Sequence, residues 1–231
     1  AKHPEVSKIY SYLATVFERQ TMYKKAEALY LCSISNMDDV LGKYNPLIQD
    51  TLCKLAVFYQ RQGKCSEAEP WNLRIFSIME IESGKGRLNQ AIVLSEFLAK
   101  LYWNQGEYLK AEEMYHRTLD MQRKIQDGDQ LLLGVTLHHL GDLCQLQNKD
   151  KDAVFFYSDS LLIKRNILGA KNIELAKTMN NFANLYKKLG KYEDAEQLYQ
   201  DTFSIFEDKL GRTHFAIIDI LKNLADCYQQ Q

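Results

Sequence analysis

The sequence predicts an all-α solenoid of five helix pairs followed by a single helix. One phrase recurs five times with small changes, as in QTMYKKAEALY (20–30), QGEYLKAEEMY (105–115) and LGKYEDAEQLY (189–199). Apolar residues recur three or four positions apart within each repeat, which is the period of an amphipathic helix. The 231 residues include only 3 prolines and 11 glycines, and this scarcity favours long helices over a fold with many tight turns.

Three series of small residues measure the repeat. The second-helix series is Ala26, Ala68, Ala111, Ala153 and Ala195, with spacings of 42, 43, 42 and 42 residues. The first-helix series, which precedes it, is Ala14, Ala56, Ala99, Gly141, Ala183 and Ala225. The third series closes each unit and is Gly42, Gly84, Gly128, Gly169 and Gly211. The first two series slip by one residue at the same place, which puts the extra residue in a predicted loop, ESGKGR (82–87).

Each unit is predicted to be a helix, a short turn, a second helix and a longer loop. The predicted units are 4–42, 46–84, 88–128, 130–169 and 172–211, followed by a last helix at 214–230. Glycine stands in the short turn at 63, 106 and 190, where a helix end needs a left-handed backbone, and Thr21 and Asn148 replace it elsewhere. The small residues of the first two series let paired helices approach closely.

No single helix pair can bury its apolar face alone, so the units are predicted to stack into one solenoid over 1–231. The last helix is either a cap for this stack or the first half of a sixth unit. The chain begins without Met and ends in CYQQQ, and we expect it to be a fragment of a larger protein.

Composition argues against several classes of function. The net charge is −1, so no overall field favours nucleic acid or an anionic membrane. No apolar run approaches the length of a membrane span. The five cysteines are scattered and form no C-x-x-C motif, which argues against disulfides and zinc and favours the cytoplasm. No nucleotide-binding or hydrolase motif occurs, so we expect neither enzymatic activity nor a cofactor.

The repeat resembles the tetratricopeptide repeat. That family has a small residue in its first helix, a Gly-x-Tyr-type turn, and an alanine followed by a tyrosine or phenylalanine in its second helix. Its usual period is about 34 residues. The period of 42 and openings such as KHPEVSKIYSYLA resemble the longer variety found in kinesin light chains and nephrocystin. The resemblance implies a right-handed superhelix whose concave groove is lined by first helices and holds an extended peptide.

The helical period predicts which first-helix side chains face that groove: those six, three and two residues before each member of the first-helix series, and one, four and five after it. Wall positions under this rule include Cys53, Val57, Gln60, Val93, Gln145 and Leu146. The candidate peptide-binding residues are Lys54, Arg61, Phe97, Lys100, Trp103, His138, Asp142, Lys177, Asn180, Asn181, Asn184, Lys187, Lys188 and Asn223. Because the fifth unit is rich in amides and lysines, we expect a protein partner with an acidic residue and an aromatic or aliphatic anchor.

Two functional patterns of the family match poorly. The lysine, asparagine and arginine positions with which chaperone-binding domains hold a terminal carboxylate are not reproduced. The adjacent asparagines of kinesin light chains occur only as Asn180 and Asn181, with Asn223 in the last helix. His138 and Asp142 have a spacing that can hold a metal, but no third ligand is evident, so we expect a groove wall with a pH-sensitive histidine and no metal.

The predicted function is therefore a non-enzymatic scaffold for protein interaction. Two alternatives remain open at this stage. One is an accessory or regulatory domain of a larger enzyme or NTPase. The other is an assembly module that uses its convex face or self-association, and the oligomeric state stays open with it.

Overall fold

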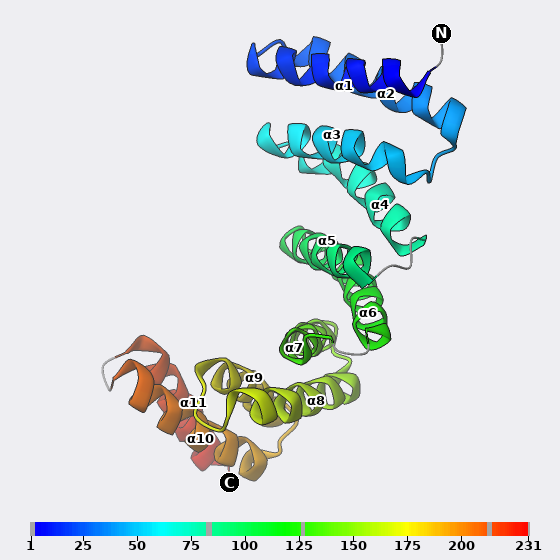
Figure 1. The fold of residues 1–231 in the computed structure, drawn as a ribbon. Helices are drawn as coiled ribbons and strands as arrows, with labels where there is room; N and C mark the ends of the chain where they lie inside the picture. The colour runs from blue at the N-terminus through cyan, green and yellow to red at the C-terminus, as the bar shows by residue number, and fades with distance from the viewer. Residues whose placement is uncertain (1–2, 82–84, 126–127, 212–213, 231) are drawn as a thin grey trace. The chain divides into compact units, whose positions relative to one another are not determined.

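The computed structural model describes residues 3–81, 85–125, 128–211 and 214–230, and within the second range the side chains of 85–87 lie outside the description. Every regular element in these ranges is a helix (Figure 1). The helices are α1 (Pro4–Arg19), α2 (Tyr23–Leu41), the 3-10 helix η1 (Pro46–Ile48), α3 (Gln49–Arg61), α4 (Cys65–Ile81), α5 (Lys85–Asn104), α6 (Tyr108–Lys124), α7 (Gln130–Leu146), α8 (Asp150–Leu168), α9 (Ile173–Lys188), α10 (Tyr192–Leu210) and α11 (Phe215–Gln230).

The prediction of five helix pairs and a last single helix is confirmed. One boundary differs from the sequence-based expectation. Residues 85–87 were expected in a loop, but α5 begins at Lys85, so the third unit opens one turn earlier than predicted. Gly84 and residues 82–83 lie outside the described residues, and the exact place of the extra residue therefore stays a prediction.

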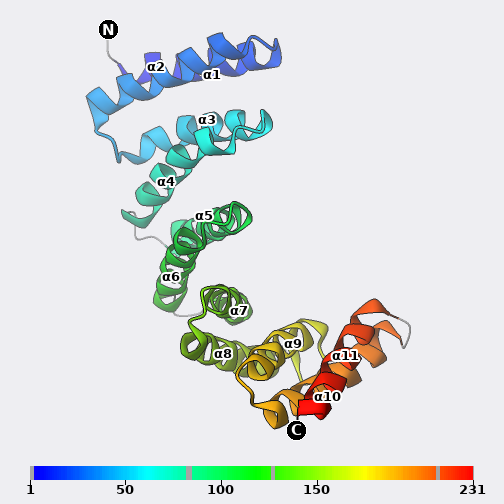
Figure 2. The ribbon, with the colours of Figure 1, turned by 180° about the vertical axis from the view of Figure 1, so that it is seen from behind.

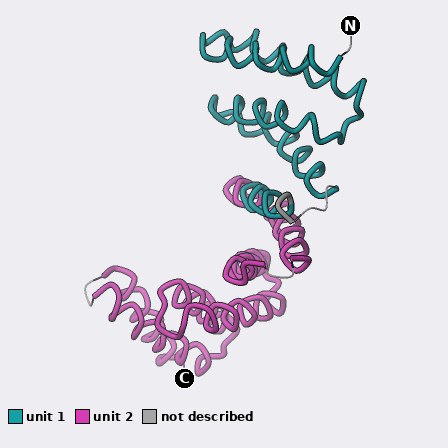
Figure 3. Tube along the Cα trace, in the orientation of Figure 1, with its two compact units in different colours: residues 1–98 teal, residues 99–231 magenta. Residues whose placement is uncertain are grey.

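The chain divides into two compact units, Ala1–Leu98 and Ala99–Gln231, and the boundary falls within α5 (Figure 3). In the first unit α1 packs on α2 and α3 packs on α4, while α3 also contacts α1 and α2. In the second unit α7 packs on α8 and α9 packs on α10, and α8 contacts α9. The paired helices of each unit lie side by side when seen from either side (Figure 2).

The small residues of the two alanine series lie where paired helices touch. Ala14, Ala26, Ala183 and Ala195 are each 0% exposed, as a close helix contact requires. Ala225 on α11 is the exception, because it is exposed. The apolar face around it, which includes Ile218 and Leu221, is exposed as well, whereas α10 covers the equivalent face of α9.

The short turns adopt the predicted left-handed backbone. Gly63, Gly106 and Gly190 have φ angles of 72°, 76° and 72°. Thr21 and Asn148, which replace glycine in two units, have φ angles of 61° and 58°. This conformation brings Cβ close to the backbone, and a β-branched residue such as Thr21 tolerates it less well than asparagine does.

Replacing Thr21 by glycine is therefore expected to raise the free energy of unfolding by about 1 kcal/mol, because glycine adopts this backbone without strain. Urea denaturation followed by circular dichroism measures the change. The matched substitution Asn148→Gly should give a smaller gain, since asparagine suits the left-handed region and its Oδ1 also accepts a hydrogen bond from Lys188. An equal gain at both sites would contradict this account.

Candidate functional site

A tyrosine follows the second-helix series by four residues in four of the five units. Tyr30, Tyr115, Tyr157 and Tyr199 occupy this position, and each is at most 1% exposed. Each of the first three rings packs against the first helix of the following unit. The ring centroids are 5.7 Å apart for Tyr30 and Phe58, 5.3 Å for Tyr115 and His139, and 5.7 Å for Tyr157 and Phe182. We call these four residues the core tyrosines.

The hydroxyls of the core tyrosines reach first-helix side chains that the sequence places on the groove wall. The single hydroxyl hydrogen of Tyr157 is shared between Asp142 Oδ1 at 2.5 Å and Gln145 Oε1 at 3.0 Å. The Tyr199 hydroxyl donates to Asn184 Oδ1 at 2.6 Å. The core therefore fixes the orientation of these wall residues.

Hydrogen bonds also connect the wall residues of consecutive units. Asn181 Nδ2 donates to Asp142 Oδ1 at 2.9 Å, and Asn223 Nδ2 donates to Asn184 Oδ1 at 3.3 Å. Lys187 Nζ in turn donates to Asn223 Oδ1 at 2.7 Å. The carboxylate and amide side chains of α7, α9 and α11 thus form a ladder with defined donors and acceptors.

A hollow of about 540 Å³ lies beside these side chains, within residues 99–231. All the residues that line it come from first helices and lie at positions predicted to face the groove. The lining residues are Trp103, Asp142, Gln145, Leu146, Asn181, Asn184 and Lys188, and we call this site the amide hollow. Its polar and apolar groups lie together in a space whose size is typical of a ligand site.

Two histidines lie beside the amide hollow. Burial lowers the pKa of His138 and of His139 to about 4 in each case, so both imidazoles are neutral at physiological pH. The expectation of a histidine that senses physiological pH was therefore wrong, because the sequence does not reveal this burial. Among the described residues, His138, His139 and Asp142 are the one group of three potential metal ligands within 4.8 Å of one another. The hydrogen bonds from Tyr157 and Asn181 already engage the carboxylate of this group.

A second, apolar pocket of about 360 Å³ lies within residues 1–98, and it was not predicted from the sequence. Among its lining residues are Val57 and Gln60 from α3, Asn72 and Ile75 from α4, and Val93 and Phe97 from α5. Asn72 takes the place of the core tyrosine in this repeat. The sequence carries a sign of this pocket. The recurring phrase ends in WN in the second repeat (62–72), whereas in the other four repeats it ends in tyrosine. We call this site the Asn72 pocket.

The model of the tetratricopeptide repeat family matches residues 89–166, 156–208 and 174–231, which together cover more than half of the chain. The chain belongs to the tetratricopeptide repeat family. A search of the curated proteins finds no match. The family assignment therefore rests on the family model, with the fold in agreement.

Solved structures share the tetratricopeptide fold at low sequence identity. BtubC (BKLC) from P. vanneervenii matches with a TM-score of 0.64 and 18% identity, over 88% of this chain and 82% of that chain. The nearly identical repeats of a Podosopora anserina protein named as a kinesin light chain match with a TM-score of 0.56 and 18% identity, over 90% and 98% of the two chains. At this level of identity the two likenesses show the fold alone, and that fold agrees with the family assignment.

A third match is to a signal transduction ATPase with numerous domains from Pyrococcus horikoshii, which carries a tetratricopeptide repeat sensor. Its TM-score is 0.62 at 17% identity, and it covers 95% of this chain but 32% of that chain. In this tetratricopeptide domain, no helix of the described residues has the length and apolar character of a membrane span.

The lysines of the fifth tetratricopeptide unit already have partners within the chain. Lys187 Nζ lies 3.1 Å from Asp226 Oδ2, and Lys188 Nζ lies 2.9 Å from Asp150 Oδ1. Lys177 Nζ lies 2.6 Å from Glu174 Oε1, one helical turn away. An acidic group of a partner must therefore compete with these carboxylates, which was not evident from the sequence.

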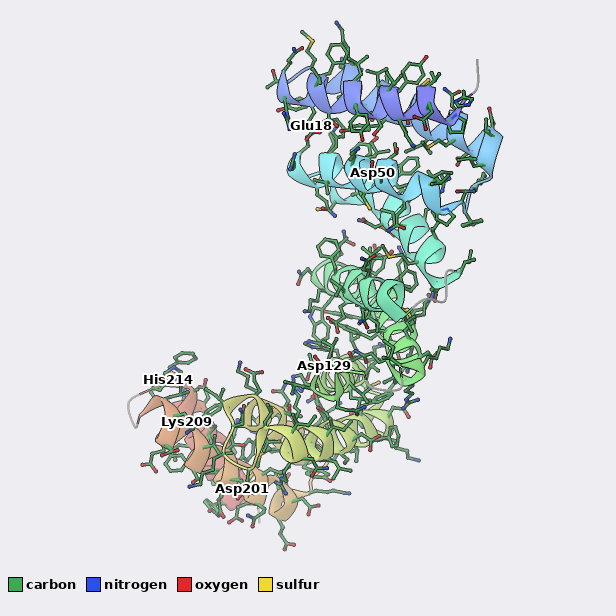
Figure 4. The ribbon with its side chains drawn as sticks, viewed as in Figure 1. Glu18, Asp50, Asp129, Asp201, Lys209 and His214 are labelled. Atoms are coloured by element: carbon green, nitrogen blue, oxygen red, sulfur yellow. The ribbon has the colours of Figure 1, made fainter. Side chains whose placement is uncertain are left out.

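The other candidate peptide-binding residues are distributed over the two compact units, 1–98 and 99–231. In the first unit Lys54 pairs with Asp50, and Arg61 Nη1 lies 3.0 Å from Oε1 of Glu18, which Figure 4 labels on α1. Phe97 is 44% exposed in the Asn72 pocket. In the second unit Lys100 is exposed and Asn180 is half-buried. The structure thus brings five candidates together in the amide hollow: Trp103, Asp142, Asn181, Asn184 and Lys188.

Proposed function

We propose that this tetratricopeptide domain is a non-enzymatic protein-interaction scaffold that binds an extended peptide segment of a partner protein in the amide hollow. Tetratricopeptide repeats indicate a scaffold for protein interaction in general, and the use of this hollow is our proposal. The observation that carries it is the lining of the hollow, which consists of first-helix residues at the positions predicted to face the groove.

The polar groups of the hollow complement a peptide backbone. Asn181 uses its Nδ2 to donate to Asp142, which leaves its Oδ1 as an acceptor. Asn184 uses its Oδ1 to accept from Tyr199 and Asn223, which leaves its Nδ2 as a donor. One acceptor and one donor on the same helix can bind the N–H and C=O of an extended segment whatever its side chains are.

The apolar groups of the hollow supply the anchor site. Trp103 and Leu146 both line it, and Leu146 is 51% exposed. A partner side chain that covers Leu146 removes this apolar surface from water, and aromatic anchors such as Trp103 carry much of the binding energy in many interfaces. Because the lysines are paired internally, we expect an aromatic or aliphatic anchor to contribute more than an acidic residue does.

Replacing Leu146 by lysine is expected to weaken binding of a groove-directed peptide about tenfold or more, because it replaces the apolar anchor site with a charge that must be desolvated. Peptides selected from a random displayed library against the unmodified chain supply the ligand. Calorimetry then measures the dissociation constant of each selected peptide with the variant and with the unmodified chain.

Leu162→Lys is the matched control. Leu162 is 62% exposed on α8, in the same repeat but outside the lining of the hollow. This control should bind the selected peptides as the unmodified chain does. Equal losses in the two variants, or selected peptides that are all indifferent to Leu146→Lys, would exclude the amide hollow as the binding site.

A second candidate function is an accessory or regulatory domain of a larger enzyme or NTPase. The match to part of a much longer ATPase chain favours it, since the same fold serves there as one component among others. The amino-acid sequence of the full-length parent protein tests this candidate, which predicts a nucleotide-binding or hydrolase module in the same polypeptide.

A further inference from the structure

The Asn72 pocket lies where the other repeats hold an aromatic ring. Tyr30 and Tyr157 each lie between two first helices, because the hydroxyl bonds to the first helix of its own repeat and the ring packs against that of the next. Asn72 leaves much of this space open, because its side chain is far shorter than a tyrosine ring. The result is a pocket of about 360 Å³ between α3, α4 and the part of α5 in the first unit.

The groups that contact a core tyrosine elsewhere are present in this pocket. The Tyr157 hydroxyl donates to Gln145, four residues after Gly141 of the first-helix series, and Gln60 stands four residues after Ala56. His139 packs against the Tyr115 ring, and Phe97 holds the equivalent place two residues before Ala99. Gln60 and Phe97 both line the Asn72 pocket.

Asn72 adds a group that the other repeats lack. Its side chain is 4% exposed and lines the pocket, yet its Nδ2 has no hydrogen-bond partner among the described residues. A buried amide donor without a partner destabilises the folded chain, and a ligand acceptor that reaches it removes this penalty.

The lining of the pocket also selects by charge. Among the residues whose side chains the structure describes, the lining contains no aspartate, glutamate, lysine, arginine or histidine. Burial raises the pKa of the Cys53 thiol, which therefore stays neutral. An ionised ligand would lose its hydration there without gaining a partner of opposite charge.

We propose that the Asn72 pocket binds an uncharged para-substituted phenol. The ring stacks on Phe97, the hydroxyl donates to Gln60, and an acceptor at the para position accepts from Asn72 Nδ2. The pocket uses no residue of the amide hollow, so this inference goes beyond the proposed function, and either can fail while the other stands.

The probe is 4-hydroxyacetophenone, studied with the full chain at a pH where its hydroxyl is protonated. Two analogues each lack one polar group: acetophenone has no hydroxyl, and 4-ethylphenol has no carbonyl. Calorimetry should give each analogue about tenfold weaker binding, the size expected for one hydrogen bond. Nuclear magnetic resonance should show the probe shifting the side-chain amide signal of Asn72.

Two variants assign each polar group of the probe to one residue. Asn72→Leu should abolish the advantage of the carbonyl and keep that of the hydroxyl. Gln60→Leu should do the reverse, and it keeps the test informative if Asn72→Leu folds poorly, because Gln60 is only half-buried. Gln130→Leu, which replaces an exposed glutamine at the start of α7, is the control and should leave probe binding unchanged.

A capped tripeptide with a central tyrosine identifies the source of the ring. Displacement of the probe by this peptide would support the pocket and assign its ligand to the side chain of a partner protein. Binding of the free probe alone would support the pocket as a small-molecule site. Equal affinity for all three compounds, or no binding of the probe at millimolar concentration, would overturn the inference.

Discussion

Replacing Lys164 by methionine is expected to raise the free energy of unfolding by about 3 kcal/mol. Lys164 lies in α8, is 2% exposed, and its Nζ donates to the neutral hydroxyl of Thr178 at 2.9 Å. The equivalent position holds Met37 in the first repeat and Met79 in the second, and both are buried. The repeat therefore accepts methionine here, and the substitution removes the cost of burying an ammonium group.

This effect has a defined pH dependence. Burial lowers the pKa of Lys164 from 10.5 to about 8, so the unfolded chain binds more protons than the folded chain between these values. The contribution of Lys164 to stability therefore rises with pH from about 8 to 10.5, and it is most unfavourable below pH 8. The gain from methionine should accordingly be full at pH 7 and should shrink above pH 8.

Urea denaturation of both chains across this pH range tests the prediction. Lys151→Met, an exposed substitution on the same helix, is the control and should change stability by less than about 0.5 kcal/mol. A Lys164→Met chain that is no more stable at pH 7, or whose gain does not change with pH, would contradict the account of a costly buried charge.

Replacing Gly141 by alanine is expected to lower the free energy of unfolding by about 1–2 kcal/mol, although alanine stands at this position in every other repeat. A Cβ added at Gly141 would lie 2.7 Å from Cδ1 and 2.8 Å from Cε1 of Tyr157. That ring is 0% exposed and its hydroxyl is bonded to Asp142, so it cannot move away easily. Overpacking costs about 1–3 kcal/mol, which exceeds the gain of up to about 1 kcal/mol from the helix propensity of alanine.

The same substitution in a Tyr157→Leu chain separates these two effects. Without the ring, alanine should be neutral or stabilising at position 141, because only the helix propensity remains. Hydrogen exchange of the amides in α7 and α8 reports the local change in both backgrounds. Destabilisation of equal size with and without the ring would show that contact with Tyr157 is not the cause.

The sequence predicted the helices because they follow from a regular period, and the same period supplied the candidate wall positions. The hollow could be anticipated from Gln145, Leu146 and Asn181 because every first helix presents the same face. The pairing of Lys188 with Asp150 could not be anticipated from the sequence, because it joins residues 38 positions apart whose rotamers depend on the packing. Lys164 and Asn72 show the same limit of prediction from sequence. Each differs from the residue that most other repeats have at its position, but only the surrounding side chains reveal the buried charge and the pocket.

The hydrogen-bond ladder within residues 99–231 would also change the entropy of the proposed peptide binding. The hydroxyls of Tyr157 and Tyr199 donate hydrogen bonds to Asp142 and Asn184, respectively. Asn181 and Asn223 in turn donate to these two residues. These side chains have therefore lost rotamer freedom during folding, before any partner arrives. Since each side chain immobilised on association costs about 0.5–1.5 kcal/mol, a peptide that docks here avoids much of that loss, and its own ordering becomes the main entropic barrier.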